Sequence, residues 1–252
     1  MNRTPPAKIK RQLRQEAGFG CAVCGNPIIE YHHIIPWSEY RHFDPEHMVV
    51  LCRNHHKELG DRLPKYAYKA KQNPINIKRG WTRGALATNK ENQALVVGGV
   101  RYLNCERAIS FYQNTIFGYS VSEGEISLNV FIPNAHFWPI VEVKGNDLLA
   151  YHDDLWDIDF KQRLVSFRRK AGENFLTIDM RNDDVEITGN IDLGSEAYSF
   201  SPKKTSFPNG GGLSGFTIDM QHNPGSAIAI GTERMIRPNY AMRFPKMQFI
   251  NS

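Results

Sequence analysis

The chain has 252 residues, 41% hydrophobic and 23% charged, which is typical of a globular protein and allows one large domain or two smaller ones. No apolar run approaches the roughly 20 residues that a membrane-spanning helix needs, and the N-terminal residues lack the apolar core of a secretory signal. We therefore expect a cytoplasmic protein.

The charge of +5 is distributed unevenly along the chain. Residues 1–90 contain 16 Lys and Arg against 7 Asp and Glu, whereas residues 91–252 contain 15 against 19. This asymmetry predicts two domains, 1–90 and 91–252. A basic first domain favours contact with a polyanion such as nucleic acid, and a merely solvated basic surface is the alternative.

The first predicted element is a basic helix over residues 6–17. Two prolines precede it and a Gly-Phe-Gly sequence follows it, as expected at the start and end of a helix. Its cations either contact phosphates or form a solvated face. The candidate nucleic-acid-binding residues on it are Lys8, Lys10, Arg11 and Arg14.

Two pairs of metal-binding side chains come next. Cys21-x-x-Cys24 is separated by 27 residues from Cys52-x-x-His55, a spacing typical of a closed tetrahedral zinc site. Three buried core cysteines would be the alternative, but they would leave the histidine at the matching gap unexplained. The segment after Cys52 reads as a short helix, on which neighbours differ by about 100°, so His56 should point away from the zinc.

Between and around these pairs lie "HHIIPWSE" (residues 32–39) and "EHMVVLCRNHHK" (residues 46–57). With the Cys-x-x-Cys pair, these motifs over residues 18–60 resemble the HNH endonuclease family in its zinc-knuckle form, which has a ββα-metal core. The resemblance implies a zinc-stabilised nuclease domain that acts on DNA. It implies nothing about residues 91–252.

The resemblance also implies roles for three histidines. His33 would be the general base that activates water, which suits a side chain with an ordinary pKa of about 6.5. His32 and His56 would bind a catalytic divalent ion such as Mg²⁺ or Mn²⁺, which stabilises the phosphate and the leaving oxygen. In a regular strand His32 and His33 would point to opposite sides, so we expect the strand to end or bend there.

The sequence departs from the family pattern at His47, where asparagine is usual. The asparagine is expected to hold or orient the loop that carries the base, and a histidine can make one such hydrogen bond. A less active enzyme is the alternative. We expect His42, in the same region, to lie in an exposed loop.

Residues 61–93 read as a connecting segment with one short helix near residues 65–71. From residue 94 onward, short β-branched and alternating runs are separated by Gly, Asn, Asp and Pro turns, which predicts an all-β sandwich or Greek-key domain. A β-solenoid is the alternative, although no fixed repeat is visible. The sequence "ERAISFYQNTIF" (residues 106–117) is expected to add a helix before the strands.

These observations predict an α+β protein: a small zinc-stabilised ββα-metal domain followed by a sandwich-like β domain. The predicted function is metal-dependent DNA cleavage, in a phage-defence or restriction-type effector whose β domain binds a ligand or protein partner. A zinc-containing nucleic-acid-binding module without turnover is the alternative. Cutting both strands with one site per chain would require a homodimer or two successive nicks.

Overall fold

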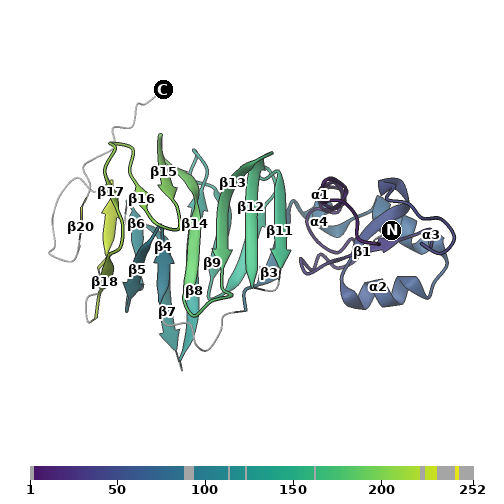
Figure 1. Ribbon diagram of the computed structural model, residues 1–252, viewed down its shortest axis with the longest axis horizontal. Coiled ribbons are helices and arrows are strands. Elements are labelled where there is room, and N and C mark those ends of the chain that lie inside the picture. Colours follow the sequence, from purple (N-terminus) through teal and green to yellow (C-terminus); the bar gives the residue numbers. More distant parts are fainter. Residues whose placement is uncertain are drawn as a thin grey trace.

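The computed structural model describes residues 3–87, 94–112, 114–122, 124–161, 163–221, 225–231 and 242–243. Figure 1 shows a small N-terminal unit rich in helices at one end of an elongated molecule and a large β unit at the other. The predicted fold class is confirmed, with a mixed N-terminal part that carries the Cys/His cluster and a large β-rich remainder.

The N-terminal unit is built on a two-stranded antiparallel sheet covered by helices on both faces. Its elements are α1 (Ala7–Glu16), β1 (Glu30–His33), a short 3-10 turn (Pro45–His47), β2 (Met48–Leu51), α2 (Arg53–Gly60), α3 (Pro64–Gln72) and α4 (Ile75–Arg79). Met48 and Val50 of β2 pack with α1, whereas Val49 and Leu51 pack toward α2 and α3, as alternation along a strand requires. The predicted helices near residues 6–17 and 65–71 are both present.

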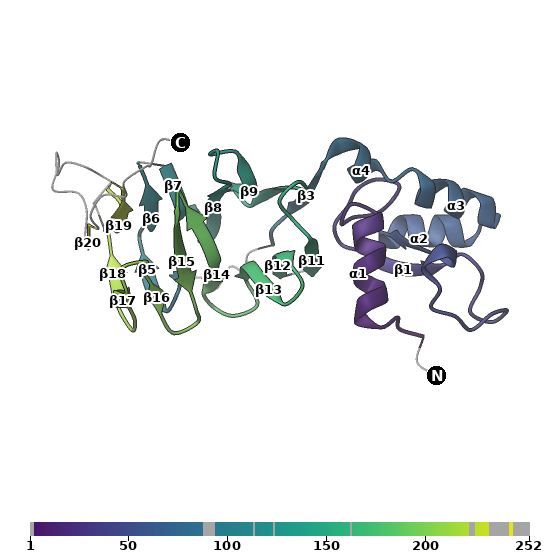
Figure 2. The same cartoon turned by 90° about the horizontal axis from the view of Figure 1, so that it is seen from above.

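The β unit is a two-layer sandwich, whose layers are visible in Figure 2. Within the described residues, one sheet has the order β20-β19-β6-β7-β8-β9-β10-β3, and the other runs from β11 to β17 in sequence order, with β4, β5 and β18 joined beside β14. Strands such as β8 (Glu125–Pro133) alternate buried and half-exposed residues, so each sheet contributes one face to a shared apolar core.

The remaining strand bounds follow. The first sheet contains β3 (Trp81–Ala85), β6 (Ile109–Phe111), β7 (Asn114–Ser122), β9 (Pro139–Lys144), β10 (Asp147–Tyr151), β19 (Ile228–Ile230) and β20 (Met242–Arg243). The second contains β4 (Leu95–Val97), β5 (Val100–Leu103), β11 (Asp157–Lys161), β12 (Leu164–Lys170), β13 (Glu173–Asp179), β14 (Val185–Leu193), β15 (Glu196–Phe200), β16 (Thr205–Ser206), β17 (Gly212–Leu213) and β18 (Thr217–Asp219).

The helix expected over residues 106–117 is wrong. This segment contains β6 and the start of β7, which pair with each other, and β6 also pairs in parallel with β19. Ile109 and Phe111 are fully buried in the sandwich core. Burial between the sheets and cross-strand pairing therefore override the local helical pattern.

The two units are in direct contact. The guanidinium of Arg14 on α1 forms two hydrogen bonds with the carboxylate of Asp157 at the start of β11, at 3.0 and 2.7 Å, and both side chains are almost fully buried. Gly84 on β3 approaches the N-terminal unit so closely that a Cβ there would lie 2.8 Å from Pro27. β3 precedes the predicted boundary near residue 90, yet it pairs with β10 at the edge of the first sheet.

No helix within the described residues is long and apolar enough to cross a membrane.

Candidate metal centre and active site

The four predicted zinc ligands lie together. Their ligand atoms are all within 4.8 Å of one another, with Cys24 Sγ 3.8 Å from Cys52 Sγ, and His55 Nδ1 3.2 Å from Cys52 Sγ. Zinc bound at about 2.3 Å from sulfur and 2.0–2.1 Å from nitrogen in a tetrahedron requires ligand separations of roughly 3.4–3.8 Å. The donor set fits one zinc ion; the sulfur–sulfur distance matches this geometry, and the distance from Cys52 to His55 is slightly shorter than it requires.

The first pair of ligands is presented by a tight turn. The N–H of Gly25 donates to the carbonyl of Cys21 at 2.8 Å, and Gly25 has a φ of +82°, which favours glycine. Asn76 of α4, which is 1% exposed, donates its side-chain amide to the carbonyls of Gly18 and Gly25 at 3.0 Å each. No local pattern indicated Asn76, because the two carbonyls that it binds lie more than 50 residues away.

His32 and His56 face each other on the side of β1 that α2 covers. Their ring centroids are 4.9 Å apart, and Nδ1 of His56 contacts a carboxylate oxygen of Glu30 at 2.5 Å. Burial, together with the neighbouring charges of His56 and His33, lowers the pKa of His32 to about 4. A histidine that stays neutral at pH 7 retains a nitrogen lone pair for a metal ion. Glu30 was not predicted as a site residue.

His33 ends β1 and points into a different environment. It is 5% exposed, and its Nε2 lies 3.2 Å from the carbonyl oxygen of His42. Since a carbonyl can only accept, Nε2 carries the hydrogen, and Nδ1 of the neutral ring keeps its lone pair. Burial lowers the pKa of His33, and the charge of His42 adds to this effect. The neutral form that can accept a proton therefore predominates at neutral pH.

His42 is buried, so the expectation that it is exposed is wrong. It is 6% exposed, its Nδ1 accepts a hydrogen bond from the N–H of Asp44 at 3.1 Å, and its Nε2 donates to the carbonyl of Ile35 at 3.3 Å. The ring thus joins the two ends of the loop over residues 34–44, while its own carbonyl holds His33. The tendency of loops to be exposed misled the sequence-based prediction, because this loop folds around its histidine.

His47 occupies the position of the usual asparagine and is half-buried. Its backbone carbonyl accepts from the N–H of Ile34 at 2.8 Å, and its Nδ1 lies 2.8 Å from the hydroxyl of Tyr68 on α3. The His42 ring lies between those of His33 and His47, with centroid distances of 5.3 and 5.9 Å. The side chain of His47 therefore reaches α3, and its main chain holds the residue after His33.

The four cations predicted to bind nucleic acid lie in different environments. Arg14 is buried against Asp157 and also donates to the hydroxyl of Tyr31 at 2.9 Å. Burial alone would lower the pKa of Arg14, but its hydrogen bonds with Asp157 raise it above the ordinary value. Arg14 thus does not belong to an exposed basic surface.

The other three cations of α1 are more accessible. The guanidinium of Arg11 lies 4.4 Å from the centre of the Trp156 ring in the β unit, and the ammonium of Lys10 lies 5.8 Å from that of Tyr31. Lys8 is exposed. Arg11 and Lys10 are half-buried beside a cleft of about 520 Å³ between the two units, so much of the basic face of α1 is turned toward the β unit.

Comparison with known proteins agrees with the geometry of this site. Residues 21–62 match the family model of HNH endonuclease, a range that contains all four zinc ligands and every histidine considered above. No curated protein and no solved structure matches the chain. The matched segment supports a metal-dependent function of the nuclease type. The similarity to the HNH endonuclease family is thus confined to residues 21–62, and the family model does not cover the β unit.

Proposed function

We propose that the protein is a metal-dependent endonuclease that hydrolyses phosphodiester bonds of DNA. The observation that supports this most directly is the hydrogen bond that fixes which ring nitrogen of His33 carries the hydrogen. Its Nε2 hydrogen is held by the carbonyl of His42, and its Nδ1 is left to take a proton from water. The adjacent pair His32 and His56 supplies two imidazoles that fit a divalent ion.

The chain's own residues divide the work of the reaction. His33 removes the proton from the attacking water, and the loop closed by His42 keeps its ring in one orientation. Glu30 holds Nδ1 of His56, which leaves Nε2 of that ring for a ligand. Mg²⁺ or Mn²⁺ bound there would supply charge stabilisation for the phosphate and the leaving oxygen. Zn²⁺ bound by Cys21, Cys24, Cys52 and His55 would stabilise the fold of the N-terminal unit.

The contact between the β unit and the N-terminal unit suggests a regulatory role for the β unit. Arg14 connects Asp157 of the β unit to Tyr31, the residue that precedes His32 on β1. We propose that a ligand or protein partner bound by the β unit acts on the nuclease through this contact. Such gating would suit a cytoplasmic effector of the phage-defence or restriction type, and a homodimer would allow both strands to be cut.

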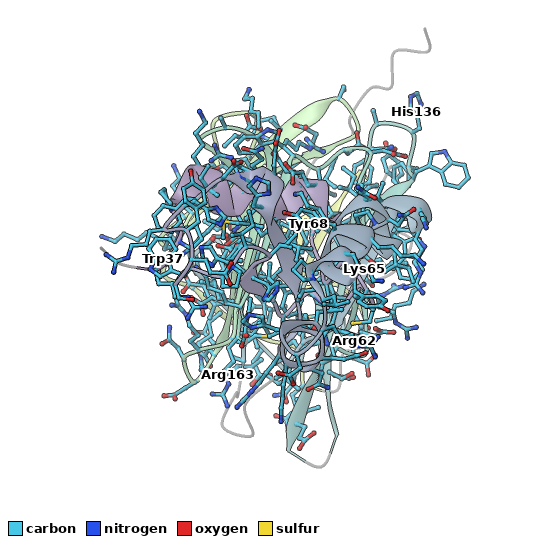
Figure 3. The ribbon with its side chains drawn as sticks, turned by 90° about the vertical axis from the view of Figure 1, so that its right-hand side faces the viewer. Trp37, Arg62, Lys65, Tyr68, His136 and Arg163 are labelled. Carbon is cyan, nitrogen blue, oxygen red and sulfur yellow. The ribbon has the colours of Figure 1, made fainter. Side chains whose placement is uncertain are left out.

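The decisive experiment is nicking of supercoiled plasmid with Mg²⁺ or Mn²⁺. We expect His33→Ala to reduce the nicking rate by at least about 10²-fold, the usual contribution of a general base, while DNA binding stays intact. The matched control is His136→Ala, because His136 is exposed in the β8–β9 loop and lies at the margin of the molecule in Figure 3.

A second candidate function is a zinc-containing nucleic-acid-binding module without turnover. The observation that favours it is His47, since asparagine is usual there and its Nδ1 is occupied by Tyr68. Binding of DNA without nicking, with any divalent metal and with or without cell extract, would support this candidate and contradict the proposed catalysis. Nicking only after addition of extract would instead support gating through the β unit.

A further inference from the structure

Helix α3 presents a basic face to solvent. Lys65, Tyr66 and Lys69 are exposed on one side of the helix, at spacings that place them together. Arg62 precedes the helix, and its guanidinium lies 5.6 Å from the centre of the Tyr66 ring, while the ammonium of Lys65 lies 5.3 Å from it. These four residues form one surface, which we call the α3 stripe.

The charge of the α3 stripe is largely uncompensated. Within the described part of the chain, neither Lys65 nor Lys69 has a carboxylate partner within ion-pair distance. Arg62 contacts Glu58 at 2.7 Å, but both side chains are about half exposed, and such pairs contribute little. On α1, by contrast, the cation of Arg14 is paired and buried. The α3 stripe is therefore better placed than the inner face of α1 to meet a polyanion.

The stripe is held in a fixed position relative to the proposed active site. The other side of α3 packs through Ala67 against the apolar cluster that includes Val49 of β2. Tyr68, on the flank of the helix, contacts His47, which in turn holds the residue after His33. Since residues three apart on a helix have Cβ atoms about 5–6 Å apart, Lys65 at the edge of the stripe neighbours Tyr68.

Figure 3 looks onto the end of the N-terminal unit. It shows Tyr68 between Trp37, on the loop that His42 closes, and Lys65 with Arg62. Figures 1 and 2 place α3, which carries most of the stripe, at the end of the molecule that faces away from the β unit. A nucleic acid strand positioned at His33 could extend across this end onto α3.

We propose that the α3 stripe binds backbone phosphates of duplex DNA next to the cleaved bond. The proposal rests on the proposed function, because it takes DNA as the substrate. Lysine and arginine side chains neutralise phosphates and release counterions, so their contribution is electrostatic and independent of base sequence. Tyr66 keeps Arg62 and Lys65 on the same surface through its ring.

The test uses the full chain with His33→Ala, so that binding is measured without cleavage. Affinity for a short duplex is measured by fluorescence anisotropy over a range of salt concentrations, with and without Lys65→Gln and Lys69→Gln together. We expect the slope of log K against log salt to fall in magnitude by about 1.8, since each lost phosphate contact contributes about 0.9. The affinity should fall by at least about tenfold at low salt.

Two further double variants show whether the change in slope is specific to the α3 stripe. Lys203→Gln with Lys204→Gln removes the same charge from an exposed site on the β unit and should leave the slope unchanged. Lys8→Gln with Lys10→Gln tests α1, and an equal or larger loss there, with none at α3, would overturn the proposal. If the parent protein binds no DNA at all, the proposed function fails. If it binds but the α3 variant behaves like the parent, only the α3 proposal fails.

A second readout uses active His33. The Lys65→Gln/Lys69→Gln variant should nick plasmid with a raised KM and nearly unchanged kcat, because the lost contacts contribute to binding substrate and transition state alike. A lowered kcat at unchanged KM would contradict a binding surface.

Discussion

The β unit buries one continuous apolar core between its two sheets, which Phe19 of the N-terminal unit joins. The N-terminal unit divides its other clustered apolar side chains between two small clusters on opposite faces of β1 and β2. Among the described residues, the fully buried members of the smaller cluster are Leu13, Ala17, Met48 and Val50. Apolar burial of this extent gives little stability to a unit of this size. The N-terminal unit must depend on other contacts, namely its Cys/His cluster and its buried polar network.

The two units also differ in the kind of polar side chain that they bury. Among the described residues, the N-terminal unit buries the imidazoles of His33 and His42, the guanidinium of Arg14 and the amide of Asn76, whereas the β unit buries mainly hydroxyl groups, with Asp157 as the partner of Arg14. Such groups are costly to bury without partners and add little net stability, so their presence in a small unit indicates a functional site. The following predictions test this contrast, from the largest expected effect to the smallest.

Removal of the zinc should unfold the N-terminal unit and leave the β unit folded. Binding of structural zinc contributes on the order of 10–16 kcal/mol in small zinc domains, which exceeds what the two small clusters can replace. Cys24→Ser removes an exposed ligand without disturbing the core. Hydrogen exchange should then increase in residues 3–80 but not in the strands of the β unit.

Cys105→Ala is the matched control, because it removes the buried thiol outside the cluster. Metal analysis should find one zinc per wild-type chain. A folded N-terminal unit free of zinc would show that the clusters suffice and would contradict the contrast between the units.

Loss of Asp157 should destabilise the protein by about 3–5 kcal/mol, because it leaves the buried guanidinium of Arg14 without its carboxylate and also removes the partner of Arg168. The measurement is denaturant unfolding of Asp157→Ala. Asp159→Ala is the control: Asp159 lies 3.9 Å from Arg14, is 26% exposed, and should contribute less than about 1 kcal/mol. Equal effects of the two variants would show that burial of the pair is unimportant.

His42→Ala should lower the nicking rate by about 10²-fold, since an error of about 1 Å in the position of a reacting group has this effect. The substitution removes both side-chain hydrogen bonds that close the loop, so the ring of His33 loses its fixed orientation. We expect the loss in kcat rather than in KM, and partial rescue by His42→Asn, which can still accept from Asp44.

The nicking rate of Tyr68→Phe should be compared with that of His42→Ala. It removes the hydroxyl that contacts the His47 side chain, but it keeps the ring packing and the backbone contact of His47 with Ile34. We expect a smaller loss of rate than for His42→Ala. A larger loss would show that the His47 side chain, and not His42, fulfils the role of the usual asparagine.

His152 should make stability depend on pH. Burial lowers its pKa in the folded protein, where its Nε2 lies 2.9 Å from Thr82 Oγ1, at the junction of the units. Below about pH 6.5 the unfolded chain therefore binds a proton that the folded chain does not, and stability falls as the pH drops toward the lowered value. One such group contributes at most about 1.4 kcal/mol per pH unit.

The measurement compares unfolding of wild type and His152→Gln between pH 5 and 7.5. The variant should show a weaker dependence on pH, whereas the exposed His136→Ala should keep the wild-type slope. Identical slopes for wild type and His152→Gln would exclude this contribution.

Much of the candidate site could be predicted because its signals are local. The two-residue gaps of the ligand pairs, and the angle between His55 and His56 on one helix, follow from the geometry of a turn and a helix. The roles of His32, His33, His47 and His56 remain predictions, although the structure places these residues as described. The helix expected over residues 106–117 was wrong, because pairing with β19 depends on residues more than 100 positions away.

The sequence by itself thus determined the metal-binding pattern, the basic N-terminal part and the β-rich remainder, since each depends on residue type and short-range spacing. Only the tertiary structure decided which cations remain exposed. Arg14 and Lys65 look alike in the sequence, but Asp157, 143 residues away, pairs with Arg14 and buries it, whereas nothing within the described residues covers Lys65. Burial depends on contacts between segments that are distant in the sequence, and such contacts cannot be predicted from the local sequence pattern.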